Sequence, residues 1–143
     1  MGYEVSCDRG RIQRDRVFAW LRGTYWVPRI RWDVFERALE GSLVVGAYDG
    51  ESGEQIGYAR AVTDYATFAW LADVFVVEEA RGRGVAKSMI RALHEHPEMQ
   101  TIRRWALATR DAQRVYEGLG YEYVPGGRWM QWVRPPETWQ EPE

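Results

Sequence analysis

Hydrophobic and polar positions follow two different periods along the chain, and the change between them marks its central unit. Residues 70–77 form a run that is apolar except for Asp73 and rich in β-branched and aromatic side chains, which is typical of a buried strand. From Val85 to Leu93, apolar side chains recur every three or four positions, which predicts an amphipathic helix. A glycine-rich turn, residues 81–86, lies between the two. We therefore expect a strand, a glycine turn and a helix in direct succession.

The same two periods predict the remaining elements. Helical spacing indicates three further helices, at residues 12–21, 32–39 and 112–119. Strand-like stretches joined by turn residues occupy residues 3–7, 42–48, 56–63, 104–108, 121–124 and 129–133. This order predicts one α/β (α+β) domain over residues 1–134, with a mixed sheet of six to seven strands and about four flanking helices. Residues 135–143 contain three prolines and are expected to be a disordered tail.

Composition narrows the class of protein. With 45% hydrophobic and 28% charged residues the chain can build an ordinary globular core, and no apolar stretch reaches the roughly 18 residues of a membrane span. Cys7 is the only cysteine and the N-terminus lacks the apolar core of an export signal, so we expect a cytoplasmic protein without an internal disulfide. The net charge of −2 gives no reason to expect a nucleic-acid partner, and His94 and His96 do not have metal-site spacing.

The glycine turn has the features of an anion site. The first turn of a helix leaves backbone N–H groups without acceptors and carries partial positive charge, so phosphate groups bind well there. Gly82 and Gly84 allow a ligand to approach the backbone closely because they have no Cβ. The spacing does not fit a Walker loop, since Gly84 lies too close to Lys87, or a dinucleotide fingerprint, since Lys87 stands where the third glycine belongs. A phosphate or pyrophosphate is the expected ligand.

Two motifs resemble those of the GNAT (GCN5-related) N-acetyltransferase superfamily. The turn at residues 81–86 reads R-x-x-G-x-A, which is similar to the family's acyl-CoA loop, [QR]-x-x-G-x-[GA], between a strand and a helix. Residues 109–121, TRDAQRVYEGLGY, resemble the late family segment N-x-x-A-x-x-[LF]-Y-x-x-x-G-[FY], with Thr109 in place of the frequent Asn. The resemblance covers the C-terminal half of the chain. It implies a GNAT fold whose sheet splays between the strands at 70–77 and 104–108.

The resemblance also implies a reaction, the transfer of an acetyl group from acetyl-CoA to a primary amine by direct attack, with a small molecule as the favoured acceptor. The residues it implies for acetyl-CoA are Val76, Val77, Arg81, Gly82, Arg83, Gly84, Val85, Ala86, Thr109 and Tyr116. Tyr116 corresponds to the family tyrosine that donates a proton to the departing sulfur, although its spacing also fits a core aromatic residue. Two alternatives stay open: a protein N-terminal or lysine acetyltransferase, and a non-catalytic acyl-CoA-binding regulatory module.

The sequence leaves open which group accepts the amine proton. Asp73 lies within an apolar strand, where a carboxylate needs a partner or a function. Strict alternation places it on the face of Leu71 and Phe75, opposite the usual face of family bases, unless a β-bulge reverses the parity. Asp73 is therefore a structural or catalytic candidate, and Asp64, Glu78 and water are the other candidate bases.

Aromatic residues are the candidates for recognition of the acceptor. Tyr25, Trp26, Trp32 and Trp70 are candidates for a wall that binds a cationic or aromatic amine, and core packing is the favoured alternative for each. The apolar stretch at residues 129–132 is a candidate homodimer interface.

Overall fold

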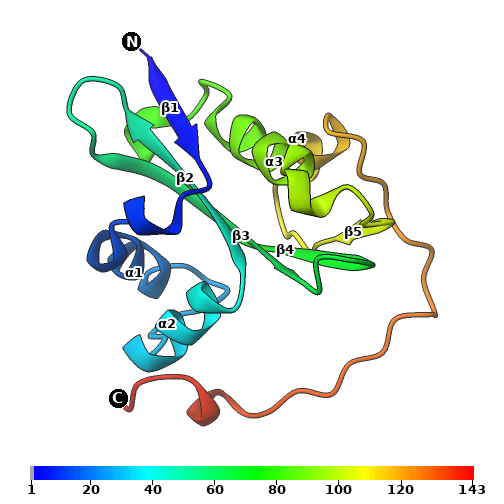
Figure 1. The fold of residues 1–143 in the computed structure, drawn as a ribbon. Helices are drawn as coiled ribbons and strands as arrows, with labels where there is room; N and C mark the ends of the chain where they lie inside the picture. Colours follow the sequence, from blue (N-terminus) through cyan, green and yellow to red (C-terminus); the bar gives the residue numbers. More distant parts are fainter. Residues whose placement is uncertain (1) are drawn as a thin grey trace.

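One mixed β-sheet forms the middle layer of the protein. The computed structural model describes residues 2–143, and its strands lie in the spatial order β1-β2-β3-β4-β5. The strands are β1 (Tyr3–Ser6), β2 (Leu43–Asp49), β3 (Gln55–Thr63), β4 (Phe68–Val76) and β5 (Arg104–Ala106). The first four pair antiparallel, and β5 runs parallel to β4. The predicted α/β class is confirmed (Figure 1).

Helices cover both faces of this sheet. They are α1 (Arg14–Arg22), α2 (Trp32–Glu40), α3 (Val85–Glu95) and α4 (Gln113–Glu117), and short 3-10 turns occupy Arg9–Arg11, Glu78–Ala80, Pro97–Met99 and Pro136–Thr138. Figure 1 shows α1 and α2 on one face of the sheet and α3 and α4 on the other. Within residues 2–143, no helix has both the length and the apolar character needed to cross a membrane.

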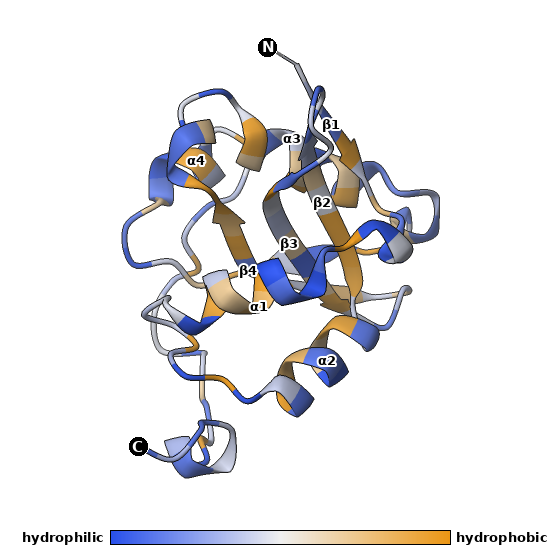
Figure 2. Cartoon of the chain, turned by 90° about the vertical axis from the view of Figure 1, so that its left-hand side faces the viewer, coloured by the Kyte–Doolittle hydropathy of each residue, from blue (hydrophilic) through white to orange (hydrophobic). Residues whose placement is uncertain are grey.

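Each helical layer closes its own hydrophobic core against the sheet. On the α3 side, the helix buries the residues that its spacing predicts, namely Val85, Met89, Ile90 and Leu93. Gly57 of β3 lets α3 lie close, because a Cβ there would come within 3.0 Å of the Met89 side chain. On the other side the buried residues are Ile12, Val17, Leu21, Ile30, Phe35, Leu39, Val44 and Tyr58. In Figure 2, α1 and α2 combine orange and blue positions, as expected for helices with one buried face.

A β-bulge in β4 changes the face to which its side chains point. Between two neighbouring β3–β4 pairs, β3 has one intervening residue whereas β4 has two, Asp73 and Val74. Asp73 has a φ of 57°, a left-handed conformation that Asp adopts more readily than most residues. Leu71 and Val74 therefore both pack toward α3, while Phe75 packs toward α1 and α2. The bulge reverses the parity and places Asp73 on the α1–α2 face.

Strands β4 and β5 separate after a short region of pairing. Their parallel ladder joins residues 68–70 to residues 104–106 and ends at the Trp70–Ala106 pair. Within the described part of the chain, residues 71–76 of β4 continue beyond this point with no strand on that edge. A wedge therefore opens between β4 and the chain that leaves β5 toward α4, as the family resemblance implies.

The strand prediction was wrong at the C-terminal end. Residues 121–124 and 129–133 form no strands in the structure, so the described sheet has five strands instead of six or seven. These residues have strand-forming side chains, but the segment runs along the outside of the molecule without a neighbouring strand (Figure 1). We call residues 122–134 the arm.

The C-terminal residues beyond the arm differ from the disordered tail that the sequence predicts. Arg31 N–H donates to Trp139 C=O at 3.1 Å, and Glu141 N–H donates to Arg29 C=O at 2.8 Å. The Trp139 side chain packs against the α1–α2 core. This apolar contact docks the segment despite its prolines.

Candidate active site

The turn at residues 81–86 places backbone amides at the start of α3. Gly82 and Gly84 both have a φ of 78°, a left-handed conformation that costs other residues free energy. The first helical hydrogen bond runs from Ser88 N–H to Gly84 C=O at 3.0 Å, so the amides of residues 85–87 come before the helical ladder begins. The turn is solvent-exposed up to Gly84. The positive end of an 11-residue helix therefore faces solvent, where it suits an anion.

The space in front of this turn is open to a ligand. A Cβ at Gly82 would meet no atom within 4 Å, and a Cβ at Gly84 would meet only Tyr3 Oη at 3.9 Å. Tyr3 Oη also lies 2.9 Å from Ser88 Oγ, which ties β1 to the first turn of α3. The residues present therefore fit a diphosphate group, and the glycines are required by backbone conformation and not by crowding.

The end of β4 lies beside this turn and directs one backbone position into the wedge. Val77 N–H donates to Ile56 C=O at 2.9 Å, and Val77 C=O accepts from Ala80 N–H at 3.0 Å. Because successive strand residues direct their N–H groups to opposite edges, Val76 N–H points to the wedge. Val76 C=O accepts from Arg81 Nε at 3.0 Å, which closes the turn onto the strand. Of the two expected strand positions, Val76 faces the wedge, whereas the backbone of Val77 is engaged within the protein.

The late helix is shorter than its sequence pattern predicts. Thr109 Oγ1 accepts from Ala112 N–H at 3.0 Å, within the turn that precedes α4. After α4, Gly120 has a φ of 95° and Tyr121 N–H donates back to Tyr116 C=O at 3.0 Å. The helix and its turn hold Tyr116 and Tyr121 next to each other, with ring centroids 6.0 Å apart.

Tyr116 is suited to keep its phenolic proton at neutral pH. The side chain is half-buried, and burial is the main cause that raises the pKa of its hydroxyl, with smaller contributions from Tyr25 and Asp111. Its neighbour Tyr121 has a hydroxyl 2.7 Å from His94 Nε2, which fixes that ring against α3. A neutral phenol can donate a proton, which is the role that the resemblance implies for Tyr116.

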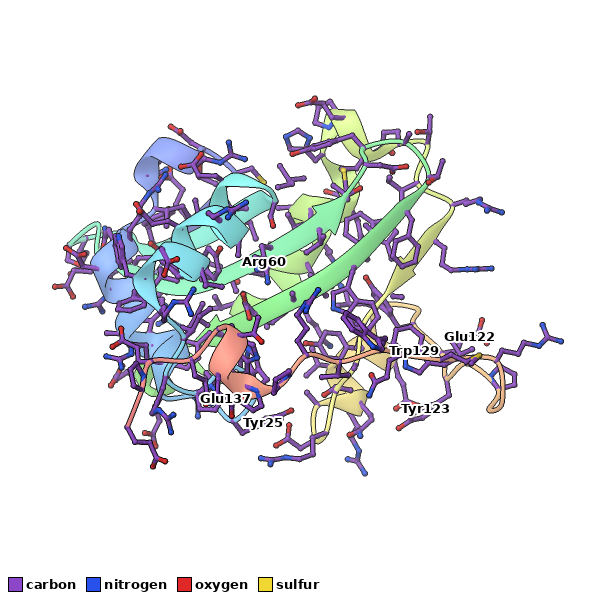
Figure 3. All side chains as sticks on the ribbon, turned by 90° about the horizontal axis from the view of Figure 1, so that it is seen from below. Tyr25, Arg60, Glu122, Tyr123, Trp129 and Glu137 are labelled. Carbon is purple, nitrogen blue, oxygen red and sulfur yellow. The ribbon has the colours of Figure 1, made fainter. Side chains whose placement is uncertain are left out.

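Asp73 is a paired carboxylate in the structure. Its Oδ2 accepts from Arg60 Nε at 2.6 Å, and its Oδ1 accepts from Trp26 Nε1 at 3.0 Å. The side chains of Arg60 and Asp73 are only 17% and 6% exposed. Arg60, labelled in Figure 3, also donates to Ser42 Oγ at 3.1 Å. Asp73 thus joins β4 to β3 and to the loop between α1 and α2. Sequence reasoning missed Arg60, although it is the only charged residue of its strand.

The other two carboxylates considered as bases have different surroundings. Asp64 Oδ1 accepts from the amides of Ala66 and Thr67 at 2.9 and 2.8 Å, and Oδ2 accepts from the Thr67 hydroxyl at 2.7 Å. These hydrogen bonds hold the pKa of Asp64 far below its usual range, which makes it a turn residue and a weak base. Glu78 is exposed and begins the 3-10 turn after β4.

Tyr25, Trp26 and Trp70 of the predicted aromatic wall lie in two separate ring pairs. Tyr25 and Trp26 meet edge to face at 5.0 Å, and the guanidinium carbon of Arg110 lies 3.7 Å from the Tyr25 ring centroid. Trp70 stacks on Trp129 of the arm at 5.5 Å. Arg110 and Trp129 were not predicted, because each comes from a segment far away in sequence. Figure 3 shows Tyr25 and Trp129 on the same side of the molecule.

A shallow groove of about 320 Å³ lies next to Trp70 on the α1–α2 face. Val62, Thr63, Asp64 and Phe68 line it together with Trp70. Trp70 stands where the β4–β5 pairing ends, so the groove begins at the narrow end of the wedge. No group of three His, Cys, Asp or Glu side chains within residues 2–143 is arranged to hold a metal ion.

The sequence of this chain matches a known protein family over the region that contains these residues. The family model described as "Acetyltransferase (GNAT) domain" matches residues 40–123, more than half of the chain. The chain belongs to the GNAT acetyltransferase family. The match includes the β4 bulge, the glycine turn and Tyr116 but not Tyr25, Trp26 or residues 124–134 of the arm.

Individual GNAT relatives agree with this assignment. The crystal structure of a candidate GNAT acetyltransferase from Xanthomonas campestris pv. campestris is 34% identical, with a TM-score of 0.87 and 95% of each chain covered. A candidate acetyltransferase from Gibberella zeae is 29% identical over 80% of this chain and 75% of its own length. Glucosamine-6-phosphate N-acetyltransferase from Arabidopsis thaliana shares the fold, with 14% identity, a TM-score of 0.66 and 94% and 99% of the two chains covered.

Proposed function

We propose that this GNAT chain is an N-acetyltransferase that moves an acetyl group from acetyl-CoA to the primary amine of a small molecule by direct nucleophilic attack. The observation that carries the proposal is the open edge of β4 beyond Trp70, which leads to the exposed turn at residues 81–84 and the N-terminus of α3. A strand edge suits the extended pantetheine chain, and a helix N-terminus suits the diphosphate that follows it. Acetyl-CoA, when bound, supplies the activated acetyl thioester.

Specific groups of the chain have defined tasks in this reaction. Val76 N–H points to the wedge, whereas its C=O already accepts from Arg81 Nε, and the amides at the start of α3 bind the diphosphate. Tyr116 Oη donates its proton to the departing sulfur as the new N–C bond forms and the C–S bond breaks. The amine must lose one proton to balance this transfer. Because both oxygens of Asp73 already have donors, a water relay to solvent fits that step better.

The Arg110–Tyr25 contact and the groove beside Trp70 support the choice of a small amine as the acceptor. The Arg110–Tyr25 contact joins the α1–α2 loop to the segment before α4, and so limits the opening of the wedge. The groove beside Trp70 has a volume in the range of small-molecule sites, about 300–1,000 Å³. Its apolar lining and the exposed rings of Tyr25 and Trp26 suit an amine that carries a flat or apolar group.

Calorimetry and a thiol-release assay test the proposal together. Titration with CoA and acetyl-CoA should give binding heat, and a panel of small amines and short peptides should show release of free CoA thiol with at least one small amine. Tyr116→Phe should bind acetyl-CoA normally but lower kcat by about 100-fold, the usual scale of a lost general acid. Tyr65→Phe, which changes an exposed hairpin tyrosine, is the matched control.

Each competing function has its own result in this assay. Turnover only with peptides would replace the small amine by a protein acceptor. Binding of acetyl-CoA without turnover on any amine would favour a regulatory module. A folded chain that gives no heat with CoA would remove the proposal.

A further inference from the structure

Tyr3 joins the N-terminal strand to the glycine turn. Strand β1 lies at the edge of the sheet opposite β5, and Tyr3 pairs there with Asp49 of β2 (Figure 1). The side chain is half-buried, and its ring packs against the core on the α3 side. Its hydroxyl lies 2.9 Å from Ser88 Oγ and donates to Arg83 C=O at 3.4 Å. One side chain of β1 therefore contacts both the glycine turn and the first turn of α3.

These three polar groups form a hydrogen-bonded chain with a defined direction. The Tyr3 hydroxyl has a single proton, and Arg83 C=O can only accept, so that proton points to the carbonyl. Ser88 Oγ then donates its own proton to Tyr3 Oη. Ser88 is in turn fixed by the helix, because its N–H donates to Gly84 C=O at 3.0 Å. The Tyr3 hydroxyl thus holds the Arg83 carbonyl at a defined position relative to α3.

The Arg83 carbonyl determines where the next amide points. In a trans peptide unit the C=O bond and the following N–H bond point in opposite directions. Because the carbonyl faces Tyr3, the Gly84 N–H faces away from β1. Gly84 is exposed, and its N–H has no acceptor within residues 2–143. Tyr3 therefore directs one amide of the turn outward, to the space where a diphosphate fits.

The glycine turn is held at two places, by two different strands. Arg81 Nε donates to Val76 C=O at 3.0 Å and attaches the start of the turn to β4. Tyr3 attaches the third residue of the turn to β1, and its ring centroid lies 5.8 Å from the Arg83 guanidinium carbon. Glycine has more backbone freedom than other residues, so a turn with two glycines keeps one arrangement only if its neighbours hold it. Tyr3 provides the attachment that lies nearest to α3.

We propose that Tyr3 is a positioning residue for the diphosphate of acetyl-CoA. It acts through the Arg83 carbonyl and the Ser88 hydroxyl, which it holds in place. The inference rests on the proposed function, since it concerns how the same site is kept ready for its ligand. A preordered turn binds an anion more tightly because it loses less conformational freedom on binding. Tyr3 lies outside residues 40–123, so the family match does not include it.

Calorimetry on Tyr3→Phe tests the proposal, because this variant loses the hydroxyl and keeps the ring that packs against the core. We expect the Kd for CoA to rise about fivefold, which corresponds to the net contribution of one hydrogen bond. Pantetheine, which lacks the diphosphate, should bind wild type and Tyr3→Phe with the same affinity. A general effect on the fold would weaken both ligands alike, so the difference between them reports on the position of the turn.

Two further variants complete the design. Ser88→Ala removes the group that donates to Tyr3 Oη. The double variant Tyr3→Phe/Ser88→Ala should bind CoA no more weakly than Tyr3→Phe, because both changes interrupt the same chain of hydrogen bonds. Glu4→Gln is the matched control, since Glu4 is the next residue of β1 and its exposed side chain points to the other face of the sheet. This control should leave the Kd for CoA unchanged.

The same titrations separate this inference from the proposed function. Equal Kd values for CoA in wild type and Tyr3→Phe would overturn the positioning role, and so would an equal loss of affinity for pantetheine. A folded wild type that binds no CoA would overturn both proposals. Because the titrations need no acceptor amine, a selective loss of CoA affinity would support the role of Tyr3 even in a chain that transfers no acetyl group.

Discussion

The buried ion pair between Arg60 and Asp73 gives the sharpest prediction about stability. Asp73→Asn keeps the shape of the side chain, and Asn tolerates the left-handed φ of 57° at this bulge. The amide oxygen can still accept from Trp26, so the substitution removes the charge and the oxygen that accepts from Arg60 Nε. What remains is the Arg60 guanidinium, 17% exposed, without its anionic partner.

The expected magnitude follows from this burial. Removal of one partner from a buried pair costs about 3–5 kcal/mol, since it leaves an uncompensated charge in a poorly solvated place. Arg60 retains some access to water and a hydrogen bond to Ser42, so we expect the lower end, about 3 kcal/mol for Asp73→Asn. Arg60→Met should cost a similar amount. The double variant should be about 2 kcal/mol more stable than the sum of the two losses, because neither charge is then left alone.

Urea unfolding followed by far-UV circular dichroism measures these values. The free energies of unfolding are comparable only if the denaturant slope stays constant across the four proteins. Asp33→Asn is the control, because it removes an exposed partner of Arg31 and should leave the midpoint unchanged. A loss below about 1 kcal/mol for Asp73→Asn, or strictly additive losses, would refute the view that this pair holds β3, β4 and the α1–α2 loop together.

Two further predictions concern Gly84 in the glycine turn and the protonation of His94. Gly84→Ala should destabilise the fold by about 1–2 kcal/mol because of the left-handed φ of 78°, and should weaken CoA binding in calorimetry, whereas Gly126→Ala should change neither. Equal CoA affinity in wild type and Gly84→Ala would count against the turn as the diphosphate site. Burial lowers the pKa of His94, so the folded chain binds fewer protons there than the unfolded chain. Stability should therefore fall as pH drops below about 6.5, and His94→Gln, which keeps a partner for Tyr121, should flatten this loss in Tm measured between about pH 7 and 5. An unchanged Tm profile in that variant would contradict a neutral buried His94.

The parts of the candidate site that sequence reasoning found are those encoded by neighbouring residues. The R-x-x-G-x-A turn and α3 were predicted because the glycines, the helical spacing and the preceding apolar run lie within one continuous stretch. Thr109 and Tyr116 became candidates for the same reason, since both lie in the continuous segment that resembles the late family motif. The wedge itself followed from the family resemblance and not from the spacing of residues.

Only the tertiary structure decided which distant residues meet. The partner of Asp73 is Arg60 across the β3–β4 bulge, and a one-residue change in register determines the face on which a strand residue lies. Trp129 reaches Trp70 from a segment whose strand-like composition produced no strand, because a strand needs a neighbour that local sequence does not specify. Sequence alone therefore determined the helices, the five strands of the described sheet and the glycine turn of this protein, whereas chain packing determined its charge pairing, its two aromatic pairs and the path of its arm.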